Sequence, residues 1–191
     1  MLFRSGFDRE SLEATYRRHQ FDTLFGERLD SVEGKNDVSP IWRIDWTSEL
    51  SESGMFGSDF DFRRHIVSAR ARLRPSEHQA FGVRAIGGWS GGVLPPQRQF
   101  AAGGIGSVHG YDFKEQVGDT LALLNLEYEL GWRGGLKAIG FFDAGRANTG
   151  APWLKGVGWG VGISDFRVDF GYRVDGVPSS LRVVVRIGRT F

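Results

Sequence analysis

From Ile41 to the end of the chain, apolar and charged side chains alternate with a period of two residues. In the segment 120–132, Leu124, Leu126 and Tyr128 fall on one face, and Glu127 and Glu129 fall on the other. Successive side chains of a β-strand point to opposite faces of a sheet, so this period is that of a strand. The alternation recurs near residues 41–50, 60–74, 79–90, 120–132, 136–146, 156–164, 166–174 and 181–191. The sequence therefore predicts an all-β, antiparallel fold of about eight strands.

These segments also have the lengths and flanks of strands that cross a membrane. Most reach roughly the 9–11 residues that a tilted strand needs to span a bilayer. Trp or Tyr often stands near their ends, where aromatic girdles meet lipid headgroups, and the polar faces carry both signs of charge. We expect an antiparallel transmembrane β-barrel. A soluble sheet with one buried face shows the same alternation, so a soluble β-fold remains the alternative interpretation.

The composition of the chain excludes several classes of function. The formal net charge is only +1, so no single-sign field indicates a nucleic-acid partner. Cysteine is absent, which excludes disulfides, thiolate catalysis and Cys-based metal sites. The four histidines, His19, His65, His78 and His109, include no pair at metal-ligand spacing. We expect no metal, no cofactor and no enzymatic activity.

One catalytic motif occurs formally. Gly88-Trp89-Ser90-Gly91-Gly92 fits the Gly-x-Ser-x-Gly nucleophile elbow, which needs a strand before the serine and a helix after it. Here Val93-Leu94-Pro95-Pro96 follows, and such a segment does not begin that helix cleanly. We expect Ser90 to be an ordinary strand residue.

The chain divides into two parts. Residues 1–38 form an N-terminal extension, with a weak amphipathic helix over 10–25 and a polar linker over 30–40. Residues 39–191 form the barrel domain. A long segment rich in Gly and Pro, at about 91–119, interrupts the strands and is expected to fold over or into the barrel, because loops of this length are usually functional or disordered.

The long loop resembles the sixth extracellular loop of the BamA/TamA superfamily, the bacterial surface antigen family. The matching residues are Gly103, Gly104, Val108, His109, Gly110 and Tyr111. A second match, 139–145, resembles the family's Phe-x-Asp-x-Gly strand and contains Asp143 and Gly145. The terminal Phe191, after alternating Val183, Val185 and Ile187, resembles the C-terminal aromatic signal for barrel assembly. The three matches keep the family's order over about residues 80–191.

The resemblance implies that the loop enters the barrel and that its motif arginine pairs with the acidic residue of the wall. Asp143 stands at the acidic position, but His109 stands where the family has arginine. An imidazole lacks the planar, bidentate fork of a guanidinium. We therefore expect a weaker or pH-sensitive brace, or a neighbouring arginine such as Arg98 in its place. Glu127 and Glu129 are expected to meet inward arginines such as Arg70, Arg72 or Arg84.

Four glycines alternate with apolar residues along one predicted strand: Gly156, Gly158, Gly160 and Gly162. Their face carries no side chains, so the strand has room for the close approach of a plug loop. Glycine also permits barrel curvature or strand bending, and the sequence favours neither explanation.

Eight strands are too few for a closed barrel that also holds the long loop. An eight-stranded barrel is roughly filled by its own side chains and has no room for a loop of this length. Either the loop stays outside a small barrel, or a second copy closes a 16-stranded homodimeric barrel, or the chain is cut from a longer parent. We favour the second copy, because exposed strand edges are costly in lipid.

The function that the resemblance implies is protein insertion or translocation at the bacterial outer membrane. We expect no counterpart of that family's POTRA domains, since the residues before the first strand are too few for one. The terminal strand would offer a seam for client outer-membrane or secreted proteins, with the bilayer and a second copy as further partners. Two alternatives stay open. One is a structural or pore-forming barrel or membrane anchor; the other is a soluble barrel that binds a small apolar ligand.

Overall fold

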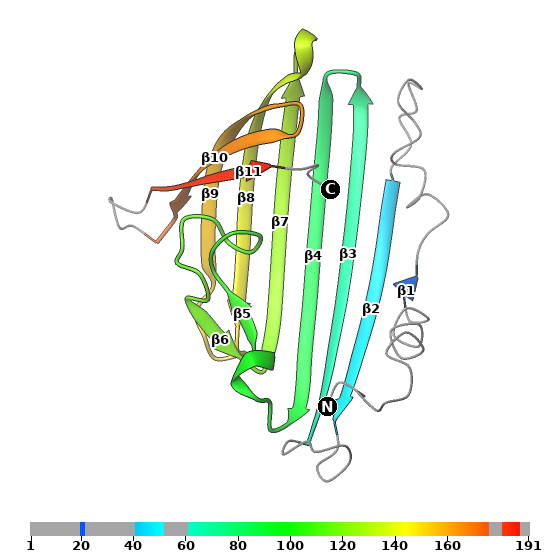
Figure 1. The fold of residues 1–191 in the computed structure, drawn as a ribbon, viewed down its shortest axis with the longest axis vertical. Coiled ribbons are helices and arrows are strands. Elements are labelled where there is room, and N and C mark those ends of the chain that lie inside the picture. The colour runs from blue at the N-terminus through cyan, green and yellow to red at the C-terminus, as the bar shows by residue number, and fades with distance from the viewer. Residues whose placement is uncertain (1–19, 22–40, 52–60, 176–180, 188–191) are drawn as a thin grey trace.

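The computed structural model describes residues 20–21, 41–51, 61–175 and 181–187, and one large antiparallel sheet dominates them (Figure 1). In spatial order its strands are β1 (Gln20–Phe21), β2 (Ile41–Ser51), β3 (Phe62–Ser76), β4 (Gln79–Gly92), β7 (Thr120–Gly131), β8 (Leu136–Ala147), β9 (Leu154–Ile163), β10 (Phe166–Arg173) and β11 (Arg182–Ile187). All neighbours pair antiparallel. The predicted all-β, antiparallel fold is confirmed, and its eight longer strands lie where the alternation predicts them.

The register carries the two-residue alternation across the whole sheet. Arg43 lies opposite Arg70, which lies opposite Arg84, which lies opposite Asn125, which lies opposite Asp143. Residues opposite one another in an antiparallel ladder share a face. We call this side the polar face. The other side, which carries residues such as Ile44, Val83, Leu126, Val161 and Val185, is the apolar face.

The apolar face is the exposed one. Many of its large side chains are exposed, from 37% for Leu73 to 85% for Ile187, and others, such as Trp46 and Phe142, are half-buried. Aromatic residues stand on it near both ends of the strands: Trp42, Phe81 and Phe166 at one end, Trp89 and Tyr172 at the other. Three charged residues share this face, and each is one residue from its strand's end: Arg63, Arg146 and Lys155.

The connections differ in length at the two ends of the sheet. At one end they are residues 77–78, 132–135 and 164–165, the second of which includes the 3-10 turn η3 (Arg133–Gly135). At the other end they are residues 52–61, 93–119, 148–153 and 174–181. Between β2 and β11, the short turns therefore gather at one end of the sheet and the longer connections gather at the other.

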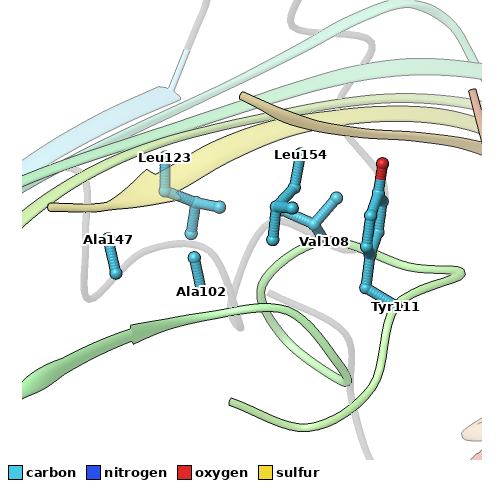
Figure 2. Close-up of a cluster of buried hydrophobic side chains, with 6 residues drawn as sticks. All are labelled: Ala102, Val108, Tyr111, Leu123, Ala147 and Leu154. Carbon is cyan, nitrogen blue, oxygen red and sulfur yellow. The ribbon is translucent and has the colours of Figure 1, made fainter. Parts of the chain in front are cut away.

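The 93–119 loop is more structured than the sequence predicts. It contains the 3-10 turn η2 (Pro96–Arg98) and a separate two-stranded sheet of β5 (Phe100–Ala102) and β6 (Gln116–Gly118). It packs on the polar face and buries the main apolar cluster there. Figure 2 shows the six members of this cluster: Ala102, Val108 and Tyr111 from the loop, with Leu123, Ala147 and Leu154 from β7, β8 and the start of β9.

The four glycines of β9 all lie on the polar face, and three of them are explained by close neighbours. A Cβ on Gly156 would overlap the carbonyl oxygen of His109 in the loop. A Cβ on Gly158 would overlap the Phe141 ring, and one on Gly160 would overlap the Asp169 carboxylate. Only Gly156 therefore admits the loop itself. The next two make room for side chains of β8 and β10.

Within the described residues the sheet is open, because no ladder joins β11 to β2 or β1. The helix predicted over 10–25 lies outside the described residues except at Gln20–Phe21, where the prediction is wrong: these residues pair with Asp45 and Ile44 as β1. The linker at 30–40 lies outside them, as does Phe191. In the part of the chain that the structure describes, no helix is long and apolar enough to cross a membrane.

Candidate functional site: a loop locked to the polar face

The centre of the loop is fastened to β8 through the buried carboxylate of Asp143, whose residue is only 2% exposed. The backbone N–H of His109 donates to Asp143 Oδ2 at 3.0 Å, and His109 Nδ1 lies 2.5 Å from the same oxygen. Asn125 Nδ2, from the neighbouring position on β7, donates to Asp143 Oδ1 at 2.6 Å and to the Ser107 carbonyl at 2.7 Å. Both carboxylate oxygens are thus occupied by donors, which balances the cost of burying the charge.

Glycines bring the loop backbone against the sheet. Gly110 has φ +88°, a conformation that favours glycine, and a Cβ there would meet the backbone between Tyr172 and Arg173 at 2.6 Å. On the wall, a Cβ at Gly145 would crowd Val108, and one at Gly171 would meet His109 Cβ at 2.6 Å. The predicted loop motif and the predicted wall residues Asp143 and Gly145 are therefore brought together. Gly103 and Gly104 also have positive φ, in the hairpin-like base of the loop.

A second charged cluster continues from His109 towards β10 and β11. Arg186 Nη2 lies 3.2 Å from His109 Nε2, and Arg186 also donates through Nε to Asp169 Oδ2 at 2.9 Å. Asp169 is completely buried and receives Arg167 Nε on its other oxygen at 2.6 Å. Arg167 Nη1 lies 2.7 Å from Glu127 Oε2 on β7. Opposite charges thus alternate from the loop across the polar face.

The outer part of the loop makes further contacts with the end of the sheet. The Tyr111 hydroxyl donates to the Lys155 carbonyl at 3.1 Å and accepts from the Lys155 N–H at 3.0 Å, and its burial raises the pKa of the Tyr111 phenol. The Arg173 guanidinium lies over the Tyr111 ring, 4.2 Å from its centre, and lowers the pKa of the exposed Asp175 carboxyl by hydrogen bonding. Arg182 of β11 reaches Asp112 of the loop at 2.5 Å.

Arg84 of β4 completes the set, donating to the Gly106 carbonyl at 2.9 Å. Side chains or backbone from β4, β7, β8, β9, β10 and β11 therefore all contact residues 106–112. The sheet curves beside the loop, and Figure 1 shows β10 and β11 crossing in front of β9 and β8.

Some partner predictions are wrong. Arg98 does not replace the missing arginine at Asp143, because it lies at the other side of the polar face, 3.5 Å from Glu49 of β2. Glu129 does meet one predicted arginine, Arg72, at 2.6 Å, but Glu127 meets Arg167 instead. The sequence does not predict the Arg167–Glu127 pair, because β10 approaches Glu127 only through the curvature of the sheet.

Sequence reasoning also missed Asn125 and Arg186. The face of Asn125 was predictable, because Asn125 alternates in the sequence with Glu127 and Glu129. Arg186 alternates with Val183, Val185 and Ile187, so its face was predictable but its partner was not. The predicted seam residues Val183, Val185 and Ile187 all lie exposed on the apolar face of β11.

The arrangement is suited to holding the loop rather than to acid–base chemistry. His109 and Asp143 form a histidine–carboxylate pair, but Arg186 stands at the second ring nitrogen, where a nucleophile would have to lie. Ser90 is in β4, and its hydroxyl donates to the Asp119 carbonyl at 2.9 Å. Among the described residues, no three His, Asp or Glu side chains gather as a metal site. The expectation of no cofactor stays a prediction.

No model of a known protein family matches the chain, and no curated protein is significantly similar to it. The resemblance of the loop motif to the BamA/TamA superfamily therefore stays a prediction, and the function has to be argued from the geometry.

We expect Asp143→Asn to release the loop. Both oxygens of Asp143 face donors, so the NH₂ group of an asparagine would point at a donor in either orientation of the amide. Losing such bonds costs about 1.5–3 kcal/mol, or roughly 10- to 150-fold in the undocked population. The measurement is the rate of chymotrypsin cleavage after Phe113, which is exposed in the loop. Asp119→Asn, at an exposed carboxylate of the same loop, is the control and should leave the rate unchanged; equal rates in the two variants would contradict the lock.

Proposed function

We propose that this chain forms half of a bacterial outer-membrane β-barrel of the protein insertion or translocation class. In this proposal the 93–119 loop is a plug held on the inner wall, and the terminal strand β11 offers a seam to client strands. The observation that carries it is the loop locked on the polar face through Asp143 while the opposite face of the same sheet is apolar and exposed.

The distribution of side chains supports a lipid-facing exterior. A water-soluble sheet covers its apolar face and exposes its polar one. Here the covered face carries Asp143, Asp169 and Arg167, all nearly inaccessible, and the exposed face carries large apolar side chains over the whole sheet. Exposed apolar surface of this extent marks an interaction surface. Aromatic residues near both strand ends and charged residues only near the ends fit the headgroup levels of a bilayer.

The connections support the same orientation. Outer-membrane barrels have short turns on the periplasmic side and longer loops outside. Residues 77–78, 132–135 and 164–165 would then be periplasmic, and the plug loop would begin and end at the outer surface. The six longest strands, β2 to β4 and β7 to β9, each have 10 to 15 residues, enough to span a bilayer while tilted.

The edges of the sheet support a role that involves strand pairing. Among the described residues, β11 pairs only with β10, so one side of its backbone is unpaired. An unpaired edge is a template for strand addition, which is the physical basis of client capture by β-augmentation. In this proposal a client strand pairs with β11 and its alternate side chains meet lipid beside Val183 and Val185.

A second copy is the proposed closure of the barrel. The polar face of eight long strands already holds a loop of 93–119, which the interior of an eight-stranded barrel would not accommodate. Because the number of long strands is even, β2 of one copy would run antiparallel to β11 of the other around a twofold axis, with the two-residue β1 displaced from the β2 edge. A client strand would enter by opening this seam. Such a closure would give 16 strands and leave fewer unpaired edges in lipid.

A pore or structural barrel is the second candidate. Arginines line the polar face of β3 beside the loop: Arg64, Arg70 and Arg72. A wet channel with a charged lining would conduct ions, and a closed barrel without an accessible seam would serve only as an anchor.

We expect Leu126→Arg, in the middle of β7 on the apolar face, to block insertion into liposomes. A charge near the bilayer midplane costs about 2–4 kcal/mol in a transmembrane barrel. The matched control is Thr47→Arg, in the middle of β2 on the polar face, where Asp45 and Glu49 flank the new cation. Insertion is measured by flotation with the vesicles and by protease protection. A soluble β-protein would tolerate Leu126→Arg at least as well as Thr47→Arg.

Liposomes that contain the protein should accelerate the folding of other outer-membrane barrels diluted from urea, because the β11 edge presents unpaired backbone groups to an entering strand. Folding is followed by the change in gel mobility of unboiled client. Empty liposomes and liposomes with an unrelated barrel are the controls. No acceleration, together with a large and steady conductance in planar bilayers, would reject the insertion function in favour of the pore.

The mass of the folded protein in detergent should correspond to two chains. Light scattering with refractive index detection separates the protein mass from that of bound detergent. A uniform population of single chains would contradict closure by a second copy, without bearing on the loop lock within one chain.

A further inference from the structure

His109 contacts two different parts of the sheet through its two ring nitrogens. Nδ1 lies 2.5 Å from Asp143 on the wall strand β8, and Nε2 lies 3.2 Å from Arg186 on the terminal strand β11. The imidazole is buried, with the Phe141 ring 4.5 Å away centre to centre. One loop side chain therefore joins two strands that are three positions apart in the sheet order.

The neighbours of the imidazole determine which nitrogen carries its proton. A guanidinium has N–H donors and no acceptor, so Nε2 must accept from Arg186. Nδ1 then carries the hydrogen and donates to the Asp143 carboxylate. In this arrangement each of the two hydrogen bonds of the ring has a charged partner, the stronger kind of hydrogen bond.

Arg186 is itself held in place. Its Nε and Nη2 both donate to Asp169 Oδ2, and Asp169 is buried against Arg167 on β10. The guanidinium is thus oriented by Asp169 with Nη2 directed also at His109. Its position does not depend on the loop alone, so it is a fixed donor to which the loop can dock.

We propose that Arg186 supplies, through the His109 imidazole, the cation of the loop lock, so that the plug loop and the terminal strand β11 are released together. A second contact joins the same two segments, since Arg182 of β11 reaches Asp112 of the loop. The ladder holding β11 in the sheet has six residue pairs, all with β10. The side-chain contacts between β11 and the loop therefore supplement the short ladder that holds β11 against β10.

Such coupling is reciprocal. If docking of the loop stabilises β11 in its place, then β11 in its place stabilises the docked loop by the same free energy. The coupling stands on the contacts of one chain. Its consequence for clients rests on the proposed function: the strand that offers the seam would open only when the plug undocks.

A double-mutant cycle tests the relay. Arg186→Gln should raise chymotrypsin cleavage after Phe113 about tenfold, as expected for losing a charged hydrogen bond of about 1.5 kcal/mol. His109→Arg places a guanidinium where it can pair with Asp143 directly and no longer needs a donor from β11. In the His109→Arg background, Arg186→Gln should change cleavage by less than about twofold. The same large increase in both backgrounds, or no increase in either, would overturn the relay.

The reverse direction is tested by hydrogen exchange at β11. Asp143→Asn, on β8, should raise the exchange of the 183–187 amides, and Asp119→Asn should not; unchanged exchange at 183–187 would overturn the joint release. Should Arg186→Gln fail to fold, Arg186→Lys replaces it in the cycle, since an ammonium keeps the charge beside Asp169 but lacks the fork that serves Asp169 and His109 together. These measurements need no client and no second copy, so they separate the relay from the insertion function.

Discussion

The buried carboxylate of Asp143 is the interaction on which the rest of the loop structure depends. A carboxylate removed from water needs donors on both oxygens, and the loop supplies them through the backbone and ring of His109 while β7 supplies Asn125. The apolar cluster of Val108, Leu123 and Leu154 forms around this point. Hydrophobic contact alone would hold the loop near the sheet; the carboxylate fixes its position and register.

Glycines on the sheet leave the space that this close contact requires. Gly145, Gly156 and Gly171 on three successive strands of the sheet leave the space that Val108 and His109 occupy. Gly158 and Gly160 of β9 accommodate the side chains of Phe141 and Asp169 instead. Glycine weakens a strand interior, so its repeated use here indicates that close packing on the polar face offsets that loss.

The polar face thus behaves as a connected interior and the apolar face as an exterior. Hydrogen bonds and ion pairs run from Asp143 through His109 and Arg186 to Asp169, Arg167 and Glu127, across the loop and four strands. His109 contacts both Asp143 of the wall strand and Arg186 of the terminal strand, so the loop, β8 and β11 meet at one side chain.

The sequence by itself determined the strands, their faces and the loop, because alternation with a period of two residues is a local property that each strand carries independently of its neighbours. The pairing of Asp143 with His109 was predicted only through the resemblance of their motifs to those of the BamA/TamA superfamily. Only the tertiary structure decided which arginine completes the site, since Arg98 is closer in sequence to His109 but Arg186 is closer in space. The pairings Arg186–His109 and Arg167–Glu127 depend on how far the sheet curves around the loop, and curvature arises from the sum of strand twist, glycine positions and loop packing rather than from any single segment. The sequence likewise leaves the ends of the sheet unspecified, because edge pairing is decided by what lies beside β2 and β11 in space.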